Sequence, residues 1–220
     1  MATETRQTAP RPYRKRKRAV SELETRQRIT EAAVDLHQTV GPAHTSVKAI
    51  AARAGVDRAT VYRHFPDEQA LFNACTGHYY ASHPMPDPGQ WVAITNPDER
   101  LRAALADLYT WYGETEEMLA TGIRDIEHVP AESRQAFLGY FEAVRAALLA
   151  RRRERGRTRR RIGAAIGHAI NFHTWHSLVR EQQLSIDEAI TLMAATVHAA
   201  AQPAPSPRAQ TRRAIPRSRV

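Results

Sequence analysis

The stretch Val47–Phe65, VKAIAARAGVDRATVYRHF, places the strongest constraint on how this chain folds. Apolar residues recur with helical spacing on each side of Gly55, which predicts two short helices, one capped by Thr45 or Ser46 and one by Asp57. Glycine at the junction tolerates the positive φ that ends a helix. A helix of about eight residues is too short to hold in water, where about 12–15 are needed. Packing against other parts of the chain must therefore support both helices.

The side chains of the second short helix divide into two groups. Val61 and Phe65, together with Val56 in the turn, are expected to anchor it to neighbouring helices. The polar and amphipathic side chains that the core does not need are Arg58, Thr60, Tyr62, Arg63 and His64. Two helices joined by a glycine turn, the second presenting hydrogen-bond donors, form the helix-turn-helix motif that reads the major groove of DNA.

Helical patterns also occupy the rest of the chain. A capping box at 21–24 predicts the start of a first helix that ends at Gly41-Pro42, and a fourth helix is expected from near Asp67 towards Tyr79. A Pro-rich loop is predicted at 83–91, and further helical patterns cover 97–113, a short stretch to about 122, 130–155, 158–183 and 185–201. No stretch alternates with period two, so the expected fold class is all-α.

The formal net charge of +9 is concentrated at the two ends of the 220-residue chain. Residues 1–20 carry +6 and residues 203–220 carry +5, which leaves −2 between them. Segments of this composition form no core, so a disordered basic arm at 1–20 and a disordered basic tail at 202–220 are predicted. The chain has no apolar run of ~18 residues, no secretory signal and one cysteine, which predicts a cytoplasmic protein without a membrane span or disulfide.

The segment Thr45–Leu71, TSVKAIAARAGVDRATVYRHFPDEQAL, closely resembles the DNA-binding segment of TetR-type transcriptional regulators. The Ala-Gly-Val turn, the Tyr-x-His-Phe ending and the following proline have the spacing of that family, and the match covers about residues 22–71. Residues 172–193 resemble, less specifically, the last two helices of some members. The resemblance implies an N-terminal three-helix DNA-binding domain at 21–82, followed by a larger helical effector-binding and dimerisation domain at 83–201.

Transferred residue by residue, the resemblance implies contacts with an operator in double-stranded DNA. Phosphate contacts are expected from the second helix and the Tyr62 phenol, and base contacts from the third helix, with His64 at the groove wall. Arginine pairs with guanine, and a small methyl group packs against thymine. The residues expected at DNA are Thr45, Ser46, Lys48, Arg58, Ala59, Thr60, Tyr62, Arg63 and His64.

One departure from the family pattern concerns charge. Glu68 stands where family members often carry a phosphate-binding lysine, and residues 21–75 hold six Lys/Arg against seven Asp/Glu. A neutral domain is unusual for a DNA reader. We therefore expect the basic arm to supply the missing attraction by lying along or in the minor groove. Its basic residues are Arg14, Lys15, Arg16, Lys17 and Arg18.

The resemblance also implies a homodimer, whose two-fold axis matches a palindromic operator, and a small-molecule effector that the sequence does not identify. The residues expected at the dimer interface are Gly163, Gly167, Ile186, Ile190, Met193 and Val197, although packing within one chain explains the same stripe equally well. The candidate walls of an effector pocket are Trp111, Tyr112, Phe137, Tyr140, Phe141, Phe172 and Trp175, which simple core packing would also explain.

Other chemistry has little support. His173 and His176 are spaced to face one metal ion, but no carboxylate or thiol converges on them, so no metal site is predicted. Hydrolase, phosphate-loop and zinc-protease motifs are missing, so neither catalytic residues nor a cofactor are expected. The favoured function is a repressor released by a small molecule; an activator and a ligand-independent, architectural DNA-binding protein are the alternatives. The arginine-rich segment 151–161 has no assigned role.

Overall fold

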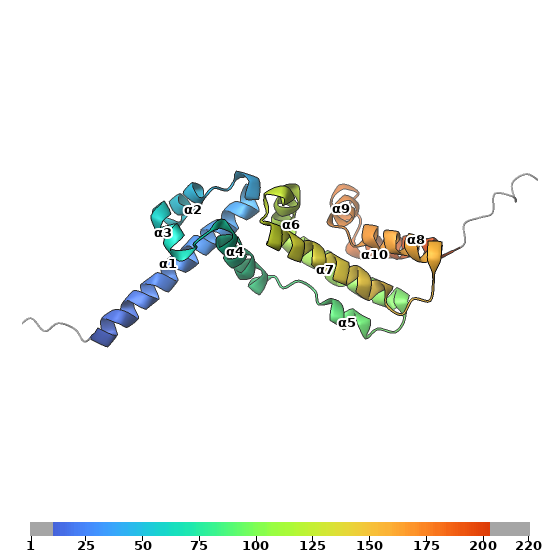
Figure 1. The fold of residues 1–220 in the computed structure, drawn as a ribbon. Coiled ribbons are helices and arrows are strands. Elements are labelled where there is room, and N and C mark those ends of the chain that lie inside the picture. The colour runs from blue at the N-terminus through green and yellow to red at the C-terminus, as the bar shows by residue number, and fades with distance from the viewer. Residues whose placement is uncertain (1–10, 203–220) are drawn as a thin grey trace, which may run out of the picture. The chain divides into compact units, whose positions relative to one another are not determined.

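The computed structural model describes residues 11–202, with side chains described from residue 15 onward (Figure 1). Within this range the chain is helical and contains no strand, which confirms the all-α fold class. The α-helices are α1 (Arg11–Thr39), α2 (Val47–Ala54), α3 (Arg58–His64), α4 (Glu68–Ser82), α5 (Pro88–Val92), α6 (Pro97–Arg124), α7 (Ala131–Leu149), α8 (Gly156–Ala169), α9 (Phe172–His176) and α10 (Ile186–Ala201). Single turns of other helix types lie at Pro42–His44, Ile126–His128 and Ser177–Glu181.

The described chain forms two compact units that are not consecutive in sequence. The first contains residues 11–86 and 111–140, and the second contains residues 87–110 and 141–202. Helices α6 and α7 each contribute to both units, because the boundaries fall inside them.

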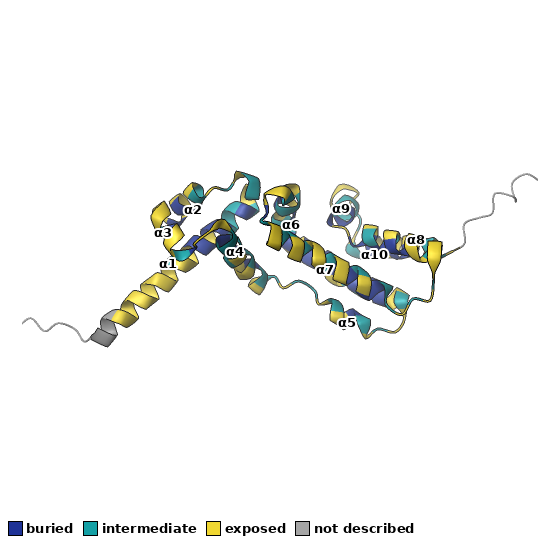
Figure 2. Ribbon diagram, viewed as in Figure 1, coloured by how far each residue is buried: buried dark blue, intermediate teal, exposed yellow. Residues whose placement is uncertain are grey.

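In the first unit, helices α2, α3 and α4 pack around the C-terminal half of α1 (Figure 1). The buried side chains of this core are Ile29, Ala32, Ala33, Ile50, Ala51, Ala54, Val61, Phe65, Leu71 and Cys75. The alanines let the backbones of α1 and α2 approach each other closely, since a methyl group needs little room. Residues 15–24 of α1 extend beyond this core and are exposed (Figure 2).

Local capping signals predicted several helix ends correctly. The side chains of Ser46, Asp57 and Asp67 accept backbone N–H groups at the starts of α2, α3 and α4. Gly55 ends α2 with φ +66°, as expected for a left-handed C-cap. Ser185 begins α10 with a complete capping box.

The predicted start of the first helix is wrong. Helix α1 begins at Arg11, ten residues before the expected capping box at 21–24, so residues 11–20 are helical rather than disordered. Lysine and arginine are good helix formers, and lengthening an existing helix avoids the cost of nucleating a new one. The rest of the predicted arm, residues 1–10, and the predicted tail from 203 onward lie outside the described residues, as does the side chain of Arg14.

Other predicted boundaries also differ. Pro88 lies in the first turn of α5, where Asp87 caps the helix, so the expected loop is partly helical. Helix α6 continues through Gly113, since the turn around it includes the buried Tyr112 and Thr115. Helix α7 ends at Leu149, not near 155. The expected helix 158–183 is interrupted because the Asn171 side chain accepts the His173 N–H and starts α9.

The second unit has its own core around the N-terminal part of α6. One arginine side chain is fully buried in this core. Arg100 is 0% exposed. Its guanidinium donates hydrogen bonds to the carbonyls of Ile94, Ala147 and Ala150. The last two carbonyls lie at the end of α7, where helical hydrogen-bond partners run out and a cation complements the helix dipole.

None of the helices within residues 11–202 combines the length and the apolar character needed to cross a membrane.

Replacement of Arg100 should destabilise the fold. Arg100→Met removes the buried guanidinium that donates to the carbonyls of Ile94, Ala147 and Ala150, and we expect it to lower the free energy of unfolding by about 2–4 kcal/mol. Arg102→Met on the same helix, where Arg102 is exposed, should stay within about 0.5 kcal/mol of the unaltered protein. Urea denaturation of both variants measures this difference, and equal effects would contradict the role assigned to Arg100.

Candidate functional site

Helices α2 and α3 form the predicted helix-turn-helix, and α3 divides its residues between core and solvent. Val61 and Phe65 are each 1% exposed, whereas Tyr62 between them is 43% exposed. Arg58, Ala59 and Arg63 are exposed, and Thr60 and His64 are half-buried. On α2, Lys48 is exposed, as is Ser46 at its start, while Thr45 is half-buried. The residues expected at DNA therefore include a continuous exposed group on one helix.

Hydrogen bonds within the protein already engage two of these groups. The Thr45 hydroxyl donates to the Gly41 carbonyl at 2.8 Å, which uses its only proton. The Ser46 hydroxyl oxygen instead accepts the Ala49 N–H at 3.2 Å, which leaves the Ser46 proton for an outside acceptor. His64 turns its Nε2 atom into the protein, where no hydrogen-bond partner is found among residues 11–202. Burial lowers the pKa of His64, and Arg63 and Arg26 lower it further, which favours the neutral imidazole.

Arg26 of α1 supports α3 directly, which the sequence patterns did not predict. Its guanidinium lies over the Phe65 ring, 4.1 Å from the ring centroid, and donates to the His64 carbonyl at 2.6 Å. A planar guanidinium can stack and donate at the same time. Because 38 residues separate Arg26 from His64, no local signal in the sequence could have revealed this contact.

A second group of contacts joins the end of α1 to the end of α6. The Asp125 carboxylate accepts the Ala43 N–H at 3.1 Å and pairs with Arg124 at 2.7 Å. Arg124 also donates to the Val40 carbonyl at 2.8 Å, and its hydrogen bond to Asp125 lowers the pKa of that carboxyl to about 2. Gly41 has φ +90°, and a Cβ atom there would lie 2.3 Å from Asp125 Oδ2. We call Val40, Gly41, Ala43, Arg124 and Asp125 the α1–α6 clasp.

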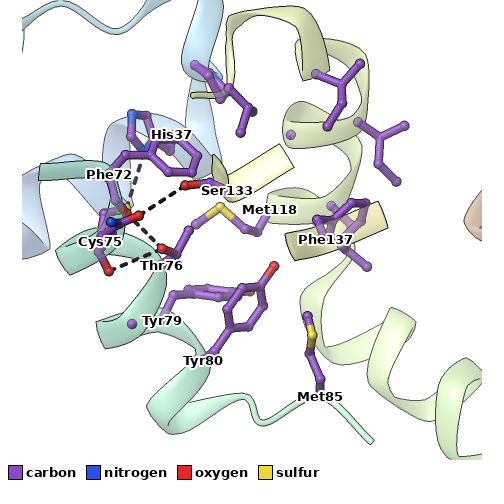
Figure 3. Close-up of a pocket in the computed structure, with 18 residues that line it drawn as sticks. His37, Phe72, Cys75, Thr76, Tyr79, Tyr80, Met85, Met118, Ser133 and Phe137 are labelled. Carbon is purple, nitrogen blue, oxygen red and sulfur yellow. Dashed lines mark hydrogen bonds between the residues drawn. The ribbon is translucent and has the colours of Figure 1, made fainter. Parts of the chain in front are cut away.

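A cavity of about 400 Å³ lies next to this clasp in the first unit. It is enclosed by the end of α1, by α4, by the C-terminal part of α6 and by the start of α7 (Figure 3). Tyr80, Met118 and Phe137 project into the same space from three of these helices (Figure 3). The other lining residues are His37, Pro42, Phe72, Asn73, Cys75, Thr76, Gly77, Tyr79, Met85, Leu119, Gly122, Ile123, Ile126, Val129 and Ser133.

His37 and Cys75 lie next to each other in the cavity wall. His37 Nδ1 lies 3.3 Å from Cys75 Sγ, and the His37 ring is 5.2 Å from the Phe72 ring. Burial lowers the pKa of His37 to about 4 and raises the pKa of Cys75 to about 12. Both side chains are therefore neutral near pH 7. The Thr121 hydroxyl of α6 donates to the His37 carbonyl at 2.8 Å, which adds a further link between α1 and α6.

Comparison with known proteins bears on the segment that contains the helix-turn-helix. Residues 29–75 match the family model of bacterial regulatory proteins, tetR family. The chain carries a TetR-family DNA-binding domain. Proteins of this family are DNA-binding transcriptional regulators, and the matched segment contains the helix-turn-helix of α2 and α3. A comparison with curated protein sequences gave no significant match.

Solved structures share the fold of this chain over most of its length. A TetR-like transcriptional regulator from Rhodococcus sp. RHA1 is 24% identical with a TM-score of 0.56, covering 79% of this chain and 93% of its own. NalD, the secondary repressor of the MexAB-OprM multidrug efflux pump in Pseudomonas aeruginosa, is 21% identical with a TM-score of 0.59, covering 82% and 96%. A tetR-family transcriptional regulator from Streptomyces coelicolor is 18% identical with a TM-score of 0.51, covering 80% and 78%.

Most of the aromatic residues that the sequence suggested as walls of an effector pocket do not line this cavity. Phe137 lines the cavity, and Trp111, Tyr112, Tyr140, Phe141, Phe172 and Trp175 do not. Trp111 donates to the His83 carbonyl and Tyr140 to the Pro86 carbonyl, so these two residues hold the segment after α4. Phe172 and Trp175 are buried in the second unit with their ring centroids 5.4 Å apart. The lining aromatics of α4 were missed because α4 was assigned wholly to the DNA-binding domain.

Most of the residues that the sequence suggested for a dimer interface are buried within the chain itself. Ile190, Met193 and Val197 of α10 are buried, and Ile186 is half-buried. Gly163 is buried with Leu149 of α7 nearest to it, whereas nothing lies within 4 Å of a Cβ atom placed on Gly167. The opposite face of α10 is open to solvent and includes Leu192, which is 45% exposed. Packing within one chain therefore explains why Ile190, Met193 and Val197 are apolar.

The arginine-rich segment 151–161 is mostly exposed. Arg151, Arg153, Arg155, Arg157, Arg159, Arg160 and Arg161 are exposed around the connection from α7 to α8. The side chain of Arg152 is 5% exposed and lies 3.6 Å from Asp98. No group of three or more His, Cys, Asp or Glu residues in the described part of the chain is arranged to hold a metal ion.

Loss of Arg26 should loosen the recognition helix of the TetR-type domain. Arg26→Ala removes both the stacking on Phe65 and the hydrogen bond to the His64 carbonyl, and we expect amide hydrogen exchange in α3 to become about tenfold faster. Arg26→Lys should show a smaller acceleration, because an ammonium group cannot stack as a plane. Arg28→Ala, an exposed arginine on the same helix, is the control. Equal acceleration in Arg28→Ala would contradict the support assigned to Arg26.

Proposed function

We propose that the chain acts as a homodimer that represses transcription from a palindromic operator and is released by a small molecule. The observation that carries this proposal is the exposed row on α3, which lies on the opposite side from the buried Val61 and Phe65. In this proposal residues 21–82 bind DNA, and residues 83–201 supply the remaining walls of the effector site and the dimer contacts.

Contacts with DNA follow from the exposed groups of α2 and α3. Arg58 and Arg63 are exposed and long enough to pair with guanine edges, and the exposed Ala59 methyl suits a thymine methyl. Phosphate contacts come from the Ser46 hydroxyl, the Lys48 ammonium and the Tyr62 phenol. The Thr45 hydroxyl already donates its proton to the Gly41 carbonyl. In this proposal Thr45 therefore lies near the DNA at the start of α2 without donating a hydrogen bond to a phosphate.

The basic arm is a helix, which changes how it would meet DNA. Lys15, Arg16, Lys17 and Arg18 are exposed on α1. A helix with its side chains is about 10–12 Å wide, whereas the minor groove is about 6 Å wide. We therefore propose contact with phosphates along the groove edge in place of insertion into the groove. Consecutive residues on a helix point about 100° apart, so about two of the four face the phosphates at one time.

Dimerisation would use the solvent-facing side of α10. Leu192 is exposed there together with Ala195, Thr196 and Ala199, which share this side at helical spacing. These small and apolar side chains permit close packing of a second helix. Two copies related by a two-fold axis would present two α3 helices to successive half-sites of a palindrome.

Effector release would act through the α1–α6 clasp. The cavity is lined by residues within one turn of Arg124, namely Gly122 and Ile123 of α6 and Ile126 of the turn that follows it. A ligand that displaces this turn moves Asp125 and Arg124, and these residues hold the Ala43 and Val40 ends of the segment leading into α2. The same α1 helix carries Arg26 beneath α3. The clasp therefore offers a short physical connection between a filled cavity and the DNA-reading helix.

Selection of bound sequences from a random DNA pool tests the proposed function. We expect an inverted repeat whose half-sites lie about one helical turn apart, bound at least ~10³-fold more tightly than bulk DNA. Arg58→Ala and Arg63→Ala should each relax the preference at particular base pairs, at a cost of about 1–3 kcal/mol. Arg102→Ala, an exposed arginine of the second unit, serves as the control. Selected sequences without two-fold symmetry would contradict the dimeric operator.

The helical arm should control the salt dependence of operator binding. Replacing Lys15, Arg16, Lys17 and Arg18 with glutamine should reduce the slope of log K against log salt by about two units, since each phosphate contact contributes about 0.9. The control variant loses the same number of positive charges at another place in the chain. In it the exposed Arg151, Arg153, Arg155 and Arg157 are replaced with glutamine. An unchanged slope in the arm variant, or an equal reduction in the control, would exclude the arm from the interface.

A further inference from the structure

We infer that the cavity between α1, α4, α6 and α7 binds a neutral, mainly apolar small molecule and rejects ions of the same skeleton. This inference deepens the proposed function and rests on it in one respect, namely that the cavity is the effector site. It names the chemical class of the effector from the residues that line the cavity.

The cavity wall carries no residue with a permanent charge. None of its 18 lining residues is Lys, Arg, Asp or Glu. A charged group that enters such a site loses its water and finds no counter-ion, which costs several kcal/mol for an unpaired ion. A carboxylate or ammonium ligand is therefore disfavoured by the wall itself.

The titratable groups of the wall are also neutral. Besides His37 and Cys75, the wall contains Tyr79 and Tyr80. Burial raises the pKa of Tyr79, with a smaller contribution from the Glu117 carboxylate. Burial also raises the pKa of Tyr80 to about 12, with smaller contributions from Tyr79 and Cys75. Neither tyrosine ionises near pH 7. The wall therefore stays uncharged throughout the neutral pH range.

Most polar groups of the wall are satisfied by the protein. The Thr76 hydroxyl donates to the Phe72 carbonyl at 2.8 Å, and the Ser133 hydroxyl lies 3.1 Å from the Asn73 side-chain oxygen (Figure 3). Within residues 11–202 the Tyr80 hydroxyl has no protein hydrogen-bond partner, and it points into the cavity (Figure 3). Tyr80 thus provides one donor and acceptor for a single polar group on an otherwise apolar ligand.

The size and composition of the wall further restrict the ligand. A volume of about 400 Å³ lies within the range of small-molecule sites. Phe72, Tyr79, Tyr80 and Phe137 present aromatic surface, and Met85 and Met118 add flexible thioethers that adapt to ligand shape and contact aromatic rings favourably. A compact aromatic molecule with one neutral polar group fits this combination.

Three naphthalene derivatives that differ only in their polar group provide the test. They are 1-naphthalenemethanol, which is neutral, 1-naphthoate and 1-naphthylmethylammonium. Isothermal titration of the full chain without DNA should give one site per chain for the alcohol, with a Kd at least 100-fold lower than for either ion. Binding of an ion within tenfold of the alcohol, or no binding of the alcohol, overturns the inference.

Variants of the wall locate the binding site. Met118→Arg should bring 1-naphthoate to within about tenfold of the alcohol by supplying a counter-ion, and Met118→Leu, which keeps the wall neutral, should leave the preference unchanged. Tyr80→Phe should weaken the alcohol about fivefold without altering the binding of 1-methylnaphthalene, so this variant tests the site even if Met118→Arg does not fold. An unchanged affinity of Tyr80→Phe for the alcohol overturns the assigned role of Tyr80.

Operator binding is measured separately. If the alcohol binds as expected but leaves the selected operator bound, the ligand class stands and effector release is wrong. If the operator is not bound at all, DNA recognition is wrong while the titrations still decide the ligand class.

Discussion

The packing of the seven-residue helix α3 against α1 is the contact on which the remaining structure depends. A helix of this length has too few internal hydrogen bonds to persist alone. Val61 and Phe65 bury its inner face, Asp57 caps its start, and Arg26 of α1 holds its end. Because a helix repeats every 3.6 residues, Val61 and Phe65 share one face, and burying that face leaves the arginines and Tyr62 exposed. The support of α3 and its availability to DNA are consequences of the same packing.

Helix α1 connects this reading helix with the cavity. Arg26 lies under α3, and the last turn of α1 contributes His37 to the cavity wall. Val40, the first residue after α1, belongs to the α1–α6 clasp. In the proposed mechanism the effect of a ligand passes along one continuous helix, since α1 contacts both the cavity and α3. Gly41 is essential to this arrangement, because its positive φ turns the chain and the missing Cβ leaves room for Asp125.

Sequence reasoning was most accurate where a single local interaction sets a boundary. Ser46 and Asp57 cap helices as predicted, and Asp67 and Ser185 cap helices that were predicted to start at or near them. Each cap needs only a side chain and the amides two or three residues later. It failed where small local preferences compete with packing. One glycine costs about 1 kcal/mol in a helix, which the burial of neighbouring residues in α6 outweighs, so Gly113 does not end the helix.

The sequence by itself determined the all-α class, the caps and glycine turn of the helix-turn-helix, and the residues of α3 that have no place in the core. These properties depend on interactions within a few residues. Only the tertiary structure decided which side chains surround the cavity and which support α3. His37 meets Cys75 across 38 residues and Thr121 across 84, and such contacts depend on how whole helices pack. Helical periodicity marks a face as apolar, but it does not say whether that face meets another helix, a cavity or a second protomer.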